Sequence, residues 1–130
     1  MKFNLSETGA FQTEFEFGKL SISGNSDIGF KPVQLMVSSI AGCSGGVFKK
    51  ILEKKRIAYK GIEITASVER NPDEANRITK ISFHYIVDGE NLNLQQLEKS
   101  LEVAFKNCAM AQSVKGAIEI VETVSIKVQG

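Results

Sequence analysis

Alternation of apolar and polar residues dominates this sequence and limits the folds that it can adopt. Period-two patterns run through residues 3–22, 62–69, 81–88 and 118–128. Such alternation places one set of side chains on each face of a sheet, so it predicts strands with one buried side. Residues 71–73 (Asn-Pro-Asp) supply turn residues between the second and third patterns. We therefore expect three N-terminal strands, two strands in the middle and one at the C-terminus.

Two segments replace this alternation with helical spacing. Apolar residues recur every three or four positions from Pro32 to about Arg56, and proline suits a first helical position. A second helix is predicted from Asn93, a typical N-cap residue with Gln96 three positions later, and we expect it to continue to about Lys115. Strands before, between and after two helices predict an α+β fold.

Length and composition exclude several classes of function. We expect the 130 residues to form one domain over 1–130, and 16 basic against 15 acidic residues leave a net charge of +1. Without a strongly basic stripe, nucleic acid is an unsuitable partner. No stretch approaches the roughly 18 apolar residues of a membrane span, and no signal peptide opens the chain, so we expect a cytoplasmic protein with no membrane partner. Two cysteines and one histidine lack the spacings of zinc sites, so we expect no metal and no cofactor.

The predicted long helix contains an unusual run of small residues around Cys43. Gly42, Gly45 and Gly46 should together cost about 2 kcal/mol relative to alanine, so a compensating feature is expected. Three explanations are open: another element packs close to this backbone, space is left beside Cys43 for a small molecule, or the helix is interrupted. Cys43 falls at the edge of the apolar stripe, where a thiol is well placed to meet a ligand.

Cys108 and His84 are weaker candidates on pattern alone. Cys108 would lie on the apolar stripe of the second helix, where a free cysteine is most often an inert core residue. The alternation places His84 on the polar strand face, which favours an ordinary surface histidine over a group that activates a thiol. The sequence separation of the two cysteines leaves their contact undecided.

Two cysteine motifs resemble those of the OsmC/Ohr family. The first is Pro-Val-Gln-Leu at residues 32–35 followed by Ile-Ala-Gly-Cys-Ser at 40–44, and the second is Asn-Cys-Ala-Met-Ala at 107–111. The similarity covers nearly the whole chain and is greatest to a small OsmC-like branch. The resemblance implies an antiparallel or mixed sheet around a long central helix, and an intertwined homodimer with two active sites at the interface.

The resemblance also implies an activity. In the peroxidase members, one cysteine thiolate attacks the O–O bond of an organic hydroperoxide and becomes a sulfenic acid. The other cysteine then forms a disulfide, which a dithiol such as a lipoylated protein reduces. This implies Cys43 as the peroxidatic residue and Cys108 as the resolving residue of a thiol peroxidase in oxidative-stress defence. Its partners would be a small organic hydroperoxide and a dithiol or lipoyl-type reductant.

The sequence departs from the family where the thiolate is activated. An unperturbed cysteine is only a few per cent ionised at neutral pH, so a cation or hydrogen-bond donor must favour its charged form. The strongest peroxidases of the family use an N-terminal arginine held by a glutamate. Here no arginine precedes Arg56, and Gln34 stands at the glutamate position. A glutamine can form hydrogen bonds with a neighbouring group but cannot hold a cation by charge. Lys19 and Lys31 are alternative cations.

Two other functions stay open on these residues. A dimer of the same fold that has lost the arginine and glutamate would be a non-catalytic protein that binds a small apolar ligand at its interface. A purely structural dimer would carry two inert core thiols. The pKa of the Cys43 thiol separates these readings, because a value at or above about 8.5 favours the non-catalytic ones.

Overall fold

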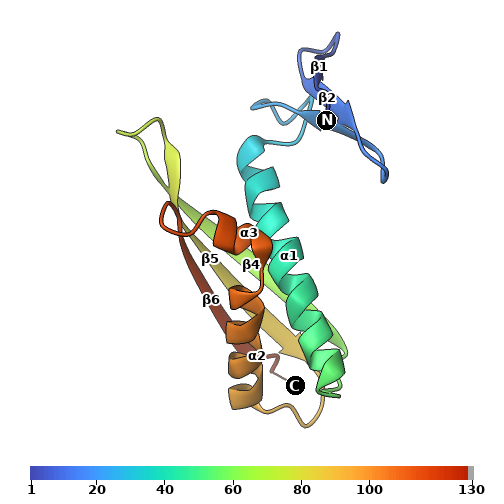
Figure 1. The fold of residues 1–130 in the computed structure, drawn as a ribbon, viewed down its shortest axis with the longest axis vertical. Coiled ribbons are helices and arrows are strands. Elements are labelled where there is room, and N and C mark those ends of the chain that lie inside the picture. The colour runs from blue at the N-terminus through green and yellow to red at the C-terminus, as the bar shows by residue number, and fades with distance from the viewer. Residues whose placement is uncertain (129–130) are drawn as a thin grey trace. The chain divides into compact units, whose positions relative to one another are not determined.

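The computed structural model describes residues 1–128 and contains the predicted order of strands and helices, with one additional short helix (Figure 1). Contacts group the chain into two compact units, Met1–Ser38 and Ser39 onward. The elements are β1 (Asn4–Leu5), β2 (Phe11–Glu14), β3 (Lys19–Ile22), α1 (Pro32–Lys54), β4 (Gly61–Asn71), β5 (Arg77–Asp88), α2 (Leu94–Lys106), α3 (Ala109–Ser113) and β6 (Glu119–Ile126). The predicted α+β class is confirmed.

The first unit is built on an antiparallel sheet in the order β1-β2-β3. Strand β2 ends at Glu14 although the alternation continues through Phe15 and Phe17, because the Phe15 N–H donates to the Gly18 carbonyl (3.1 Å) and turns the chain. Phe15 and Phe17 therefore follow the strand with exposed rings. Within residues 1–38 only Ala10 and Thr13 are buried, so this unit has very little core of its own.

Helix α1 runs without interruption through the glycine-rich stretch. A Cβ at Gly45 would lie 3.0 Å from the Ile64 Cδ1 of β4, so close packing of a strand explains this glycine. A Cβ at Gly42 or Gly46 would meet no atom of the described residues within 4 Å. Of the three explanations, close packing therefore accounts for Gly45, open space accompanies Gly42 and Gly46, and interruption is excluded.

The second unit contains a mixed sheet in the order β4-β5-β6. The first two strands form an antiparallel hairpin, and the Asn71 side chain accepts from the Asp73 N–H (3.0 Å) in the turn between them. Strand β6 runs parallel to β5, because the connection through α2 and α3 crosses over the sheet. Figure 1 shows α1 and α2 against one face of this sheet, the inner face, where Phe83, Tyr85 and Val87 of β5 are buried.

The second predicted helix ends earlier than its pattern indicates. Asn93 caps its start as expected, accepting from the Gln96 N–H (3.1 Å). The expected continuation to Lys115 is wrong, because α2 stops at Lys106 and the backbone turns out of the helix before α3 begins. Cys108 is extended (φ −85°, ψ 106°) and forms the N-cap of α3. The cysteine therefore occupies a break between two helices and not the middle of one.

Helix α1 passes one test for a membrane span. It is long and apolar enough to cross a bilayer by length and composition alone, but the core helix of a soluble protein passes the same test. Its buried residues, Ile40, Ser44, Phe48 and Leu52, recur every four positions, which is the stripe of a helix packed on one side. This pattern is that of a helix whose one side packs against the rest of the protein.

Truncating this stripe should destabilise the fold. Leu52→Ala removes a fully buried side chain of α1, and we expect it to lower the free energy of unfolding by about 2 to 5 kcal/mol. Leu94→Ala makes the same change at a residue that is 44% exposed, where we expect a loss below about 1 kcal/mol. Urea unfolding followed by circular dichroism at equal protein concentration measures both, and equal losses would contradict the assignment of α1 to the core.

Candidate active site

The fold brings Cys43 and Cys108 together, although they lie on different elements. Cys43 is on α1 and partly exposed, whereas Cys108 is fully buried at the N-cap of α3. Their side chains are within hydrogen-bonding contact, and both are free thiols. The sequence could not decide this contact. The catalytic roles of the two cysteines remain a prediction.

Backbone amides activate the Cys43 thiol. The N–H of Met110 makes the largest contribution, followed by the Cys108 side chain, and both lower the pKa of Cys43 below its ordinary value. Partial burial opposes this effect, and the N–H of Ala109 adds to it. Hydrogen bonds to a thiolate favour the charged form, which is the reactive form of cysteine. Donors of the first turn of α3 thus favour the thiolate form of Cys43.

The pKa of Cys108 moves in the opposite direction. Burial raises it most, and the neighbouring Cys43 raises it further, while the N–H groups of Ala111 and Met110 counteract in part. The Cys108 sulfur accepts the Ala111 N–H (3.3 Å) and lies 4.0 Å from the Ile40 carbonyl. Cys108 is therefore held as the protonated thiol of the pair, and its S–H donates to the Ile40 carbonyl.

The amides that lower the pKa of Cys43 could not be predicted from the sequence. The side chains of Ala109 and Met110 carry no signal, because their contribution comes from backbone N–H groups that only the break before α3 exposes. The sequence instead offered side-chain cations, Lys19 and Lys31, in place of the absent arginine. No cation is among the groups that lower the pKa of Cys43.

A second polar cluster adjoins the thiol pair. Ser44, the residue after Cys43, donates its hydroxyl to both carboxylate oxygens of Glu122 on β6 (3.1 and 2.8 Å). The Tyr85 hydroxyl donates to the same carboxylate (3.1 Å). The ring of Tyr85 packs edge-on against Phe48, with ring centroids 5.2 Å apart. Burial raises the pKa of both Glu122 and Tyr85.

Glu122 was missed although the sequence carries a sign of it. The alternation that places Ile120, Val124 and Ile126 on the inner face of β6 also places Glu122 there. A carboxylate at an inward position is costly unless it is hydrogen-bonded, and such a break in an apolar pattern is a signal of function or specificity.

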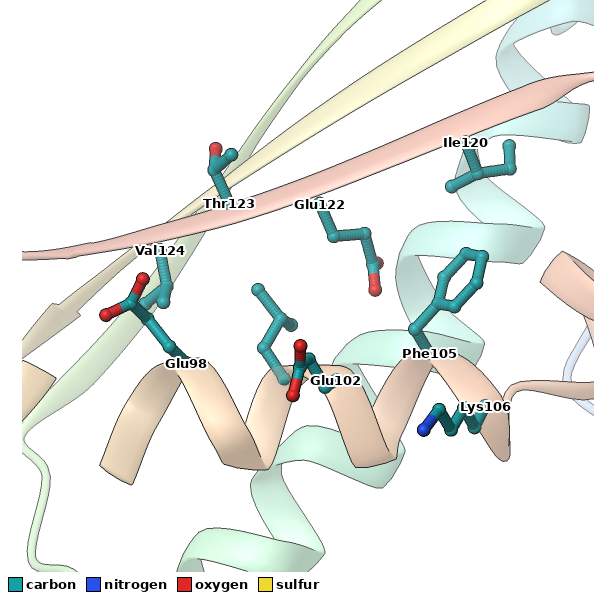
Figure 2. A pocket seen from close by; sticks show the side chains of 9 residues that line it. Glu98, Glu102, Phe105, Lys106, Ile120, Glu122, Thr123 and Val124 are labelled. Atoms are coloured by element: carbon teal, nitrogen blue, oxygen red, sulfur yellow. The ribbon is translucent and has the colours of Figure 1, made fainter. Parts of the chain in front are cut away.

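A cavity of about 580 Å³ opens beside Glu122, between α2 and β6 (Figure 2). Apolar side chains from both elements form part of its wall, and Figure 2 shows Glu122 pointing from β6 toward α2. The residues that line it are Glu98, Leu101, Glu102, Phe105, Lys106, Ile120, Glu122, Thr123 and Val124. Neither cysteine is among them, so within the described residues this cavity adjoins the Ser44–Tyr85–Glu122 cluster and not the thiol pair.

Gln34 and His84, the other residues considered from the sequence, have hydrogen-bond partners of their own. Gln34 is exposed in the first turn of α1 and accepts the Lys31 N–H (3.4 Å), so its support of Cys43 stays a prediction. His84 lies on the outer sheet face, as expected, with its ring nitrogens 2.7 Å from the Thr123 hydroxyl and 2.9 Å from that of Ser125. In residues 1–128 no group of three or more His, Cys, Asp or Glu side chains is arranged to hold a metal ion.

Comparison with known proteins identifies the family. A family model described as OsmC-like protein matches residues 24–123. The chain belongs to the OsmC-like family. The family resemblance inferred from the two cysteine motifs is thereby confirmed. At the level of the family, membership supports a role in redox or peroxide-stress chemistry.

Individual relatives of this OsmC-like protein are consistent with its family and fold. Protein YhfA of Escherichia coli (strain K12) is 26% identical over 110 residues, which cover 83% of this chain and 82% of YhfA. The organic hydroperoxide resistance protein OhrA of Bacillus subtilis (strain 168) is 26% identical over 89 residues, 68% of this chain and 62% of OhrA. The crystal structure of a hypothetical protein from Aquifex aeolicus VF5 has a TM-score of 0.87 at 23% identity, covering 99% and 96% of the two chains. Other similar structures are OsmC and Ohr proteins, which confirms the fold.

Removal of one amide donor should weaken the Cys43 thiolate. Ala109→Pro deletes an N–H at the first position of α3, where proline fits a helix and the extended Cys108 precedes it. We expect a higher pKa of Cys43 and, at neutral pH, alkylation of Cys43 that is roughly two- to fivefold slower, the effect of one hydrogen bond.

Iodoacetamide labelling at a series of pH values, read by peptide mass spectrometry, measures this shift. Ala109→Ser retains the N–H and serves as the matched control, with the labelling profile of the unaltered protein. An unchanged profile in Ala109→Pro would mean that this amide does not act on Cys43.

Proposed function

We propose that this OsmC-like protein is a thiol peroxidase that reduces small organic hydroperoxides through Cys43 and Cys108. The Cys43 thiolate attacks one oxygen of the peroxide and breaks the O–O bond, leaving Cys43 as a sulfenic acid and releasing an alkoxide that takes up a proton. The Cys108 sulfur then attacks the Cys43 sulfur, breaks its S–O bond and releases water. The product is a Cys43–Cys108 disulfide.

The opposite pKa shifts of two touching thiols carry this proposal. Cys43, whose pKa is lowered, is partly exposed and can meet a peroxide, while Cys108, whose pKa is raised, is buried behind it. A nucleophile must be ionised and accessible, whereas a resolving thiol needs only to reach the first sulfur after oxidation. This asymmetry supports the proposed roles of the two cysteines and does not depend on the family arginine.

The partners of the reaction follow from its chemistry. A disulfide between two cysteines is reduced by exchange with another thiol, so we propose a dithiol or lipoyl-type reductant and no bound cofactor. A relative named as an organic hydroperoxide resistance protein supports the choice of oxidant. Free thiols that cycle in this way suit a reducing compartment, so we place the protein in the cytoplasm.

Treatment with cumene hydroperoxide tests the reaction. The reduced protein should consume peroxide and lose two hydrogens in intact mass as the Cys43–Cys108 disulfide forms. Cys43→Ser should abolish peroxide consumption, because no other thiol in the described residues has a lowered pKa. Cys108→Ser should consume one equivalent and leave a sulfenic acid on Cys43 that dimedone traps.

Other results would remove the peroxidase reading. Thiols that stay unchanged at stoichiometric peroxide, or full turnover in both serine variants, contradict it. Peroxide-independent binding of a small apolar ligand that Cys43→Ser leaves intact would instead favour the non-catalytic dimer.

We further propose that the protein is a homodimer. Large apolar side chains are exposed throughout the first unit: Met1, Phe3, Leu5, Phe11, Phe15, Phe17, Phe30 and Met36. Monomeric proteins rarely expose so much apolar surface in one small unit, whereas a second copy would bury it. The open faces of Gly42 and Gly46 on α1 would also allow a partner element to approach the backbone closely.

Sedimentation velocity tests the dimer. The unaltered protein should sediment as a dimer at micromolar concentration, and Phe11→Glu, at a side chain 53% exposed, should shift it toward the monomer. Val103→Glu, at a similarly exposed site of α2 (45%), is the matched control and should remain dimeric. A monomeric unaltered protein would refute the dimer.

A further inference from the structure

Gln112 is a half-buried polar residue of α3 that the proposed reaction leaves without a role. Its side-chain amide crosses the break between the two helices, because Nε2 donates to the Phe105 carbonyl in the last turn of α2 (3.1 Å). The Ser113 hydroxyl, by contrast, donates to the Ala109 carbonyl (2.7 Å) and stays within α3. Among the described residues, Gln112 therefore supplies the one side-chain hydrogen bond that joins α3 to α2.

Helix α3 has few other interactions that fix its position. It is five residues long, and Ala111 is its one buried residue. An isolated helix of that length is unstable in water, where even about 12 to 15 residues are marginal. Figure 1 shows α3 turned out of the line of α2, so stacking of the two helices does not hold it either. The hydrogen bonds that leave α3 therefore decide its orientation.

The Phe105 carbonyl is the acceptor that separates the two helices. In a continuous helix this carbonyl would accept the N–H four residues later, which is that of Ala109. Here it accepts the Cys108 N–H (3.2 Å) and the Gln112 side chain (3.1 Å) instead. A carbonyl oxygen has two lone pairs, so both are in use. The Ala109 N–H thus loses its helical acceptor.

Continuation of α2 is the conformation that competes with this break. Alanine and methionine are strong helix formers, so residues 109–111 suit a longer α2. In that conformation the amides of Ala109 and Met110 would bind carbonyls of α2. In the observed conformation the same two amides bind the Cys43 sulfur. Occupation of the Phe105 carbonyl therefore determines whether Cys43 has backbone donors.

The Cys43 thiolate is sensitive to this geometry for two reasons. Cys108 is the one titratable group that shifts the pKa of Cys43, and no cation contributes, so the backbone donors have no charged substitute. A hydrogen bond also weakens steeply as its donor turns away from the acceptor. A small rotation of α3 would therefore reduce the stabilisation of the thiolate while leaving both sulfurs in place.

We propose that Gln112 is a positioning residue for Cys43. Its side-chain amide occupies the Phe105 carbonyl, keeps α2 and α3 separate, and so leaves the amides of Ala109 and Met110 to bind the Cys43 sulfur. Gln112 acts through the backbone, since its side chain bonds to a carbonyl and not to a thiol. The inference deepens the proposed function and rests on it for the role of Cys43 as the peroxidatic residue.

Alkylation of Cys43 tests this role directly. Gln112→Met keeps the length of the side chain and removes the donor. We expect the midpoint of the pH profile of iodoacetamide labelling to move to higher pH, because the thiolate loses stabilisation. At neutral pH, labelling of Cys43 should be roughly three- to tenfold slower, within the range of one net hydrogen bond. Peptide mass spectrometry after timed labelling at a series of pH values measures both quantities.

The shape of the profile separates positioning from a merely structural role. Where the pH is high enough to ionise Cys43 in both proteins, the two labelling rates should approach each other. A variant in which only access to Cys43 has changed would differ from the unaltered protein by the same factor at every pH. That result, or an unchanged profile, overturns the proposal.

Ser113→Ala is the matched control within α3. It removes a hydrogen bond of the same short helix that does not cross the break, so the labelling profile of the unaltered protein should persist. Equal shifts in Ser113→Ala and Gln112→Met would assign the effect to general loosening of α3 and overturn the proposal. If Gln112→Met fails to fold by circular dichroism, Gln112→Leu replaces it with the same expected results.

A double variant tests whether Gln112 acts through the break. Ala109→Pro maintains the break by itself, because proline has no N–H to return to the Phe105 carbonyl and favours an extended Cys108 before it. Adding Gln112→Met to Ala109→Pro should therefore slow the labelling of Cys43 by less than about twofold. The same three- to tenfold slowing in both backgrounds would mean that Gln112 acts independently of the break, contrary to the proposal.

Failure of this inference and failure of the peroxidase are distinguishable, because iodoacetamide labelling requires no peroxide. A protein that ignores cumene hydroperoxide but shows the shifted profile in Gln112→Met refutes the peroxidase and supports the positioning of Cys43. A protein that consumes peroxide and shows no shift supports the peroxidase and overturns the role of Gln112.

Discussion

The break between α2 and α3 is the constraint on which the thiol pair depends. Cys108 leaves the helical conformation, so its sulfur accepts the Ala111 N–H while the amides of Ala109 and Met110 act on Cys43. A continuous helix would bind these amides to its own carbonyls and remove the backbone donors of the Cys43 thiol. Activation by backbone amides needs no particular side chain, which explains how a chain without an N-terminal arginine retains a low-pKa cysteine.

Glu122 forms hydrogen bonds that join helix α1 to the sheet. The buried stripe of α1 contains Ser44 at a position where an apolar residue is expected. The Ser44 hydroxyl donates to the Glu122 carboxylate of the sheet, which also accepts the Tyr85 hydroxyl. Each of these polar groups is satisfied by the others, so the core tolerates them. The arrangement aligns α1 with β5 and β6 by direction-dependent bonds, a stricter requirement than apolar contact alone.

Periodicity predicted most of the fold because each element has one buried face. The alternation of β5 and the four-residue repeat of α1 follow directly from burial on one side. The end of α2 could not be predicted, because Ala109, Met110 and Ala111 all suit a continuing helix and only tertiary packing of Cys108 breaks it. Likewise the two cysteine motifs identified the sulfurs, but the activating groups are amides, which every residue except proline carries. Glu122 was visible in the sequence as a charge at an inward position.

The distance along the chain between Cys43 and Cys108 has a consequence for biosynthesis. The donors that lower the pKa of Cys43 come from a segment made long after α1, and they reach the sulfur only when α3 has docked. Until then the nascent chain carries two ordinary thiols, which react slowly with oxidants at neutral pH. On the proposed mechanism, Cys43 therefore becomes reactive only together with the native structure, and the proposed disulfide would not form in an incompletely synthesised chain.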